Sequence, residues 1–295
     1  MGWGSDIDRI ILIMALLLIV AVIIYLFIKL PKKSAGDDLK QLLDVVTSRT
    51  GKNQEPAYDR VRVCANRDEV LGERLRMIDH AKQEIRLSVA DIRISEDGKK
   101  ILAALYYAVQ RGVHVSMLLN RSAYSSNKSI HDYLKALGSE ENAQIKTYDG
   151  LNDHYLVVDK ELLILNGRDI DAISYENRTK EIHDNWDMLV VNSTKSLQST
   201  VVKVQQYFDL VWNQKRCKKC CGSVDLPSQK RVEHIKGELL GAYSHLQRKH
   251  MEWFYTENYE KSTVPTNRIL ITRGKEPQGN LILLVDSPDL AQLMF

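Results

Sequence analysis

The feature that most constrains this chain is an uninterrupted apolar stretch near its N-terminus. All 19 residues of 10–28 are apolar or Tyr. A helix of this length reaches roughly 30 Å, which is the thickness of the hydrocarbon core of a bilayer. A buried helix of a soluble protein normally keeps a polar stripe, and this stretch has none. We therefore expect residues 10–30 to form one transmembrane helix after a short tail, residues 1–9.

The charges on either side of this stretch decide between an anchor and a cleaved signal peptide. A signal peptide would place basic residues before a shorter apolar stretch, whereas Asp6 and Asp8 precede Arg9 here. The residues that follow the stretch include Lys29, Lys32, Lys33 and Lys40. This asymmetry predicts a single-pass protein of the cell membrane whose globular part is cytoplasmic, with the lysines held near anionic lipid.

The composition of the remainder permits a folded domain. The chain has 295 residues, of which 44% are hydrophobic, and its formal net charge of +3 gives no strong field that would favour a nucleic-acid partner. Three of the four cysteines, Cys217, Cys220 and Cys221, crowd one basic stretch, which is a poor layout for disulfides. The Cys-x-x-Cys pair is half of a zinc site, and no second pair completes it. We expect reduced thiols, no metal and no cofactor.

Hydrophobic periodicity predicts alternating strands and helices after a polar linker at 31–55. The predicted strands are 60–64, 85–90, 113–119, 144–148, 155–158, 162–165 and 188–191. The predicted helices are 68–81, 98–110, 129–137 and 196–212. Helices of this size between strands indicate right-handed crossovers, so we expect an α/β fold with a mostly parallel sheet flanked by helices.

Two segments divide the soluble part. Residues 56–216 should form one lobe, because the alternating pattern runs through them. Residues 217–295 begin with a basic linker, continue as a helix over 232–259, and hold two short strands within 268–285. We expect this second segment to open another lobe.

The residue types that carry chemistry gather in the segment 151–170. Asn152, His154 and Asp159 are spaced Asn-x-His, four residues, Asp, and an apolar strand follows at 162–165. On a strand, residues two apart share a face, so Asn152 and His154 should look into one pocket while Asp153 turns away.

This segment resembles the signature of the phospholipase D superfamily, most closely its cardiolipin synthase-like branch. In that branch His-x-Lys, four residues and Asp precede an apolar strand and Gly-Gly-Arg-Asn. Aligning Asp159 on the motif aspartate puts Asn152 at the histidine and His154 at the lysine. The positions of the second element are Asn166, Gly167, Arg168 and Asp169, of which Asn166 and Asp169 depart from the family pattern.

Other stretches are similar to the same branch in the same order. Residues 98–119 include Arg111-Gly112-Val113, Tyr175 follows the motif, and 185–190 and 208–213 match a later strand and helix end. The resemblance covers roughly residues 60–215.

The resemblance implies a covalent mechanism without metal or organic cofactor. A neutral imidazole attacks the phosphodiester phosphorus, a lysine and an asparagine hold the phosphoryl oxygens, and a second motif's histidine protonates the leaving group. It makes Asn152, His154 and Asp159 the candidate catalytic positions and 166–169 the candidate substrate-binding ones. The amide of Asn152 is no nucleophile, because its lone pair is delocalised. His154 could substitute in principle, and Asp169 would repel a phosphate unless Arg168 or His154 compensates.

The family's second motif would lie beyond Phe295. We therefore expect a membrane-anchored phospholipase D-like protein that transfers phosphatidyl groups or cleaves phosphodiesters on phospholipids, weak or inactive alone. Its partners would be the phospholipid membrane and a second phospholipase D-like chain, or a second copy of itself. One alternative is a non-catalytic module that binds lipid headgroups or a partner. Another is a dimeric single-motif nuclease, against which the low net charge and the missing histidine count.

Overall fold

The computed structural model describes residues 18, 20, 59–64, 66–166, 187–221, 226–266, 268–273 and 281–286. The chain divides into two compact units, residues 1–41 and 42–295, and the elements below belong to the second. The predicted anchor lies outside the described residues apart from Leu18 and Val20, as does the predicted linker, so both stay predictions. Among the residues that are described, no helix combines the length and the apolar character that a bilayer span requires.

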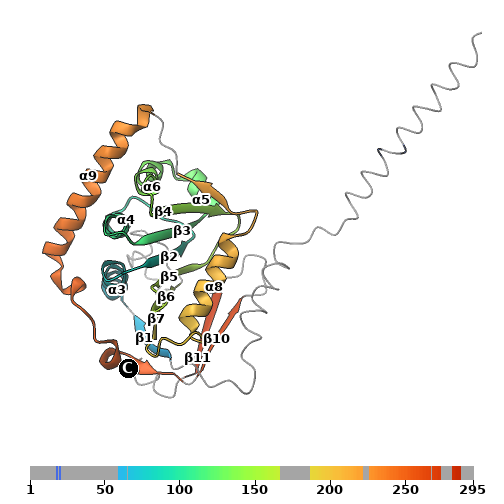
Figure 1. The fold of residues 1–295 in the computed structure, drawn as a ribbon, viewed down its shortest axis with the longest axis vertical. Coiled ribbons are helices and arrows are strands. Elements are labelled where there is room, and N and C mark those ends of the chain that lie inside the picture. The colour runs from blue at the N-terminus through green and yellow to red at the C-terminus, as the bar shows by residue number, and fades with distance from the viewer. Residues whose placement is uncertain are drawn as a thin grey trace, which may run out of the picture. The chain divides into compact units, whose positions relative to one another are not determined.

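A mixed sheet forms the centre of this unit (Figure 1). Its nine strands lie in the spatial order β8-β4-β3-β2-β5-β6-β7-β1-β9. The strands are β1 Asp59–Cys64, β2 Glu84–Val89, β3 His114–Asn120, β4 Ala143–Tyr148, β5 His154–Val158, β6 Leu162–Asn166, β7 Asp187–Asn192, β8 Lys218–Cys220 and β9 Val264–Pro265. The seven strands predicted within the first segment, 56–216, are all present in this sheet. A separate antiparallel pair, β10 Arg268–Arg273 and β11 Leu281–Asp286, confirms the last two predicted strands.

The prediction of a mostly parallel sheet is wrong. Only the pairs β2·β3 and β3·β4 are parallel, and the other six pairs of the sheet are antiparallel. A helix-containing crossover precedes each strand of the parallel pairs, as expected. Between β5 and β6 the chain has three residues, 159–161, which can form a hairpin but no crossover. The α/β class therefore holds, but only the neighbouring strands β4, β3 and β2 run parallel, and every other pairing in this sheet is antiparallel.

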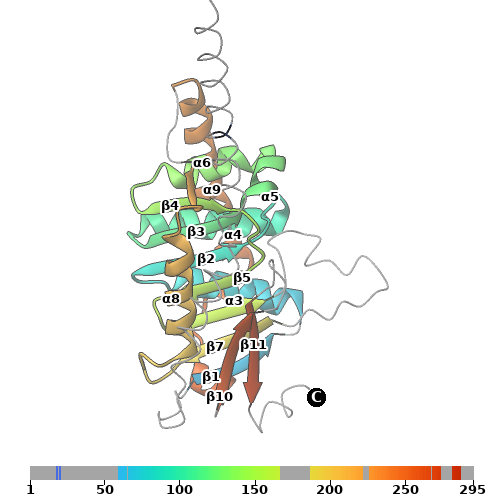
Figure 2. The same cartoon turned by 90° about the vertical axis from the view of Figure 1, so that its right-hand side faces the viewer.

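Helices cover both faces of the sheet. They are α3 Arg67–Asp79, α4 Glu96–Gln110, α5 Arg121–Ser126, α6 His131–Gly138, α8 Thr200–Trp212, α9 Leu226–Lys249 and α10 Tyr259–Ser262, with short 3-10 turns η1 Lys128–Ile130 and η2 Met251–Phe254. Figure 1 shows α3, α4 and α6 on one face and α8 on the other, and Figure 2 shows α8 running across the strands.

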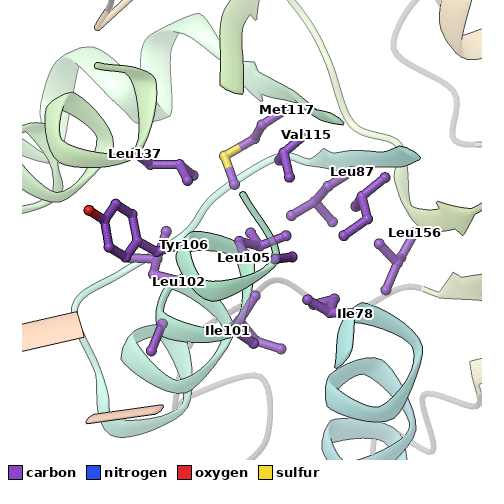
Figure 3. Close-up of a cluster of buried hydrophobic side chains, with 14 of the residues drawn as sticks. Ile78, Leu87, Ile101, Leu102, Leu105, Tyr106, Val115, Met117, Leu137 and Leu156 are labelled. Carbon is purple, nitrogen blue, oxygen red and sulfur yellow. The ribbon is translucent and has the colours of Figure 1, made fainter. Parts of the chain in front are cut away.

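The main core lies between the sheet and the face of α3, α4 and α6 (Figure 3). Leu105 of α4 points toward Leu87 of β2, Ile101 lies on the side of α3, and Leu102 lies beside Tyr106; all are buried. The spacing of Ile101, Leu102 and Leu105 by three and four residues is the apolar stripe that predicted this helix. Ser95 caps α4, because its hydroxyl accepts the N–H of Gly98 at 3.1 Å.

The start of α8 is tied to the start of β1. The Ser199 hydroxyl donates to Oδ1 of the buried Asp59 at 2.6 Å, and the N–H of Thr200 donates to Oδ2 at 2.8 Å. One carboxylate thus satisfies a helix N-terminus and fixes where α8 begins on the sheet.

Elements of the predicted C-terminal segment, 217–295, contact the lobe. β8 pairs with β4, and α9 contacts α4 and α6. The predicted helix 232–259 is too long, since α9 ends at Lys249 and η2 and α10 follow separately. Trp253 turns back to pack on Gly72 of α3, so a tertiary contact ends the helix where the periodicity continued.

Candidate functional site

The segment 152–154 enters the sheet where the parallel strands end. β5 pairs antiparallel with β2, with Ser88 opposite Tyr155, so β5 begins at the carboxyl end of β2. His154 lies opposite Asn166 at the end of β6. At the same edge β1 ends and β7 begins, with Cys64 opposite Asp187. Strand ends of this kind commonly carry binding sites in α/β folds.

Three hydrogen bonds hold the loop before β5. The Asn120 amide donates to the carbonyl of Leu151 at 2.7 Å, and the Ser88 hydroxyl donates to the carbonyl of Asp153 at 3.0 Å. The Tyr207 hydroxyl of α8 donates to Oδ2 of Asp153 at 2.7 Å in a buried setting. The carboxylate of Asp153 therefore faces α8, away from the α3 side, as the alternation of a strand predicts.

His154 faces the other side of the sheet and is only 7% exposed. Its pKa falls to about 4, because burial disfavours the imidazolium and the nearby Arg74 guanidinium repels it, against a smaller opposite effect of Asp153. At neutral pH the ring is uncharged. It cannot supply the fixed cation that the family's lysine provides at this position.

Arg74 is the cation that the sequence prediction missed. It lies in α3, is 3% exposed, and acts on His154 electrostatically. The sequence held a signal for it: Arg74 stands four residues after Val70 and four before Ile78, so it interrupts the apolar stripe of its helix. A basic residue at a position of the apolar stripe is expected to be buried, and a buried charge requires a specific partner.

Asn152 is exposed at the loop and Cys64 is fully buried at the end of β1. Burial raises the pKa of the Cys64 thiol to about 12, so this sulfur stays protonated at neutral pH and is a poor nucleophile. The amide of Asn152 has no nucleophilic nitrogen. Of the side chains described at this edge, the neutral imidazole of His154 is the one whose nitrogen carries a lone pair of nucleophilic character.

Asp159 does not join this cluster. It lies at the far end of β5, five residues or about 17 Å from His154 along the strand. Its carboxylate accepts the N–H groups of Lys82, Gln83 and Glu84 at 2.7, 2.9 and 2.8 Å. Its positive φ of 53°, followed by 59° at Lys160, forms the tight turn into β6. The structure thus places Asp159 in the turn between β5 and β6, remote from the other two candidate catalytic positions, Asn152 and His154.

The remaining predicted residues can be placed only in part. The backbone of Asn166 ends β6 beside His154. Gly167, Arg168 and Asp169 lie outside the described residues, so the substrate-binding role of 166–169 stays a prediction.

A sizeable cavity lies away from this edge. A hollow of about 660 Å³ lies at the opposite end of the strands, beside Asp159 and the segment 256–260. Asn152, His154 and Arg74 do not line it. We place the candidate site by its residues and not by cavity size.

The cysteine cluster forms part of an edge strand. Cys217, Cys220 and Cys221 are free and half-buried, and β8 carries Cys220 alongside β4. The Cys221 sulfur lies 3.3 Å from the hydroxyl of Tyr124. Within the part of the chain that is described, no group of His, Cys, Asp and Glu is arranged to hold a metal ion.

The geometry defines an α/β lobe with a polar, buried cluster where the ends of a mixed sheet meet. Residues 75–212 match the family described as cardiolipin synthase, PLD-like domain. This match assigns the segment 75–212 to the phospholipase D superfamily. No curated protein matches the chain.

Several solved structures are similar in fold. NucT from Helicobacter pylori is 14% identical with a TM-score of 0.45, over 55% of this chain and 99% of that one. A phospholipase D family member, Nuc from Salmonella typhimurium, is 18% identical with a TM-score of 0.43, over 56% and 99%. The phosphatidylserine synthase of Haemophilus influenzae Rd KW20 is 8% identical with a TM-score of 0.41, over 63% of this chain and 47% of that one.

Proposed function

We propose that the chain is a membrane-anchored phospholipase D-like protein that binds the phosphodiester of phospholipids at the edge carrying Asn152 and His154. We propose further that it is weak or inactive as an enzyme by itself. The observation that carries this is the pair of replacements: an amide stands where the family has its nucleophile, and a neutral imidazole where it has a cation. The covalent step lacks the histidine nucleophile that the family uses, whereas binding a phosphate requires no nucleophile.

The charge beside His154 supports phosphate binding. Arg74 keeps its positive charge at any physiological pH and is largely removed from solvent. A cation in such a setting acts more strongly on a nearby anion than one in water does. A phosphate at the strand ends would therefore be attracted by Arg74 while Asn152 offers its amide N–H groups as donors.

A non-catalytic module that binds lipid headgroups or a partner chain is the second candidate, and the same Asn152 observation favours it. The partner would be a second phospholipase D-like chain or another copy of this one, either of which could supply a general acid. A dimeric nuclease is a weaker candidate because the net charge of +3 is small. In each case we propose that the domain lies on the cytoplasmic side of the cell membrane.

Two parallel assays separate these functions. Detergent-solubilised full chain would be incubated with phosphatidylglycerol and, separately, with plasmid DNA. We expect no turnover of either substrate, or only slow turnover of the lipid. Rapid lipid turnover by the wild-type chain would contradict the proposal, and the variant His154→Ala would then show whether this imidazole is the nucleophile. DNA cleavage would favour the nuclease.

Restoring the family residues tests the pocket directly. The double variant Asn152→His with His154→Lys adds a cation beside Arg74, so it should bind vanadate or tungstate at least about tenfold more tightly than the wild type. The same lysine is poorly solvated and close to a like charge, so the unliganded variant should melt at a lower temperature. Tungstate should then restabilise the variant more than it stabilises the wild type. Unchanged oxyanion affinity would show that no phosphate pocket exists at this edge.

A further inference from the structure

A second hollow lies between the first turns of α4 and the last turns of α9. Its volume is about 360 Å³, within the range of small-ligand sites. Its apolar lining consists of Ile94, Ala242 and Leu246. Its basic and titratable lining consists of Lys99, Lys100, His245, Lys249 and His250, against the single acid Glu96.

Two of these cations are already compensated. The Lys99 ammonium lies 2.5 Å from Glu238, and the Lys100 ammonium lies 2.9 Å from Glu96 and 3.0 Å from the buried Asp97. They bind α4 to α9 and stiffen the first turn of α4. The acids Glu96, Asp97 and Glu238 are therefore engaged by these two lysines, and Glu252 lies 3.3 Å from the ring of His250.

Lys249 and His245 differ from that pair. Both line the hollow, and within the described part of the chain neither is in a salt bridge or a side-chain hydrogen bond, although the charge of Lys249 acts on the nearby Glu96 carboxylate. They lie four residues apart on α9, so they share one face of the helix. Two donors that are not in a salt bridge or a side-chain hydrogen bond thus line the same hollow from adjacent turns.

Packing fixes the wall of the hollow that His250 forms next to Lys249. The His250 ring stacks on Trp253 with centroids 3.9 Å apart and an interplanar angle of 4°. Trp253 is seated on Gly72 of α3, where an added Cβ would lie 2.7 Å from its Cδ1. The Lys100 ammonium lies 6.0 Å from the centre of the same indole ring. The hollow therefore has one wall that is preorganised by contacts with α3 and α4.

We propose that this hollow is a binding site for a phosphate-bearing anion, with Lys249 and His245 contacting the phosphate. An ammonium and an imidazole N–H are donors suited to phosphate oxygens. The apolar lining, Ile94 and Leu246, is suited to an uncharged part of the same ligand. Such a ligand can be a lipid headgroup or a soluble phosphate ester. The site shares no residue with the one that holds Asn152 and His154, so it does not depend on the proposed function.

Histidine NMR can observe the two sites separately. Full chain labelled with ¹³C-histidine would be titrated in detergent with sn-glycerol 3-phosphate, with dihexanoyl-phosphatidylglycerol and with glycerol as an uncharged control. We expect the His245 and His250 signals, assigned through His245→Gln and His250→Gln, to shift with both phosphates and not with glycerol. The His154 signal reports on the other site in the same samples. At least tenfold tighter binding of the lipid would identify a headgroup, and equal affinities would identify a soluble ester.

Charge reversal supplies the decisive comparison. Lys249→Glu should weaken binding of both phosphates by at least about tenfold, the effect of losing one charge-assisted contact. Arg248→Glu is the matched control, because it makes the same charge change in the same turn but does not line the hollow. We expect it to change affinity less than twofold with an unchanged melting temperature. Equal weakening by the two reversals, or an absence of His245 and His250 shifts, would overturn the proposal.

Discussion

Tyr207 donates a hydrogen bond of 2.7 Å from its hydroxyl to Oδ2 of Asp153, and this bond joins the middle of α8 to the loop that leads to His154. Both residues are nearly inaccessible to solvent. The bond crosses from one layer to another, so the orientation of the candidate site depends on a helix that begins more than forty residues later in the chain. Because Asp153 is held on the α8 side, its neighbour His154 is directed to the α3 side.

Removing this hydroxyl should destabilise the lobe. Tyr207→Phe leaves the ring in place and takes a donor from a buried carboxylate, which should lower the free energy of unfolding by about 1–3 kcal/mol. Urea unfolding of the full chain in detergent measures it. Tyr255→Phe is the control, since Tyr255 is 62% exposed and should lose nothing measurable. Equal stability of the two variants would mean that the bond contributes little.

The buried imidazole makes stability depend on pH. The pKa of His154 is lowered to about 4 from its usual value of 6.5. Between these two pH values the imidazole is protonated in the unfolded chain and neutral in the folded chain. Its contribution to stability is therefore present above pH 6.5 and is lost as the pH falls toward 4. Imidazole NMR should show His154 still neutral at pH 5.5. Replacing the nearby cation, Arg74→Met, should raise this pKa, and a wild-type midpoint near 6.5 would contradict the burial of the ring.

Asp159 should matter for folding and not for phosphate binding. Asp159→Asn keeps a residue that tolerates positive φ but loses the charge that accepts three N–H groups, and we expect a loss of about 1–2 kcal/mol. Asp159→Ala should cost more, because it removes every acceptor and strains the turn. Tungstate affinity of either folded variant should equal that of the wild type. A loss of tungstate affinity without a loss of stability would show that Asp159 does belong to the candidate site.

Alanine substitutions at three glycines separate two effects on stability, which are steric crowding in the folded state and the backbone entropy of the unfolded chain. In Gly72→Ala the new methyl meets the indole of Trp253, which must move away from α3, so we expect a loss of about 1–3 kcal/mol. Gly237→Ala and Gly241→Ala on the exposed side of α9 meet nothing within 4 Å and should stabilise the chain by about 0.4–1 kcal/mol each. Thermal melts of the three variants measure both effects. Stabilisation by Gly72→Ala would show that Trp253 is not seated there.

Local pattern determined most of the secondary structure. The stripe through Ile101 and Leu105 predicted α4, and the apolar run 162–165 predicted β6, because burial on one face repeats with the period of the element. The spacing of Asn152, His154 and Asp159 also indicated the superfamily, which the match over 75–212 supports. The periodicity of apolar residues and the spacing of a motif depend only on residues close together in the chain, so both can be recognised without the three-dimensional fold.

The tertiary structure alone decided which distant groups meet. Strand direction depended on the pairing of β5 with β2, and the end of α9 depended on Trp253 reaching Gly72. The neutral state of His154 depended on its burial in the fold and on the charge of Arg74, eighty residues earlier in the chain. A periodic pattern states that a side chain is buried but not against which partner, and a pKa is set by that partner and by the solvent that it excludes.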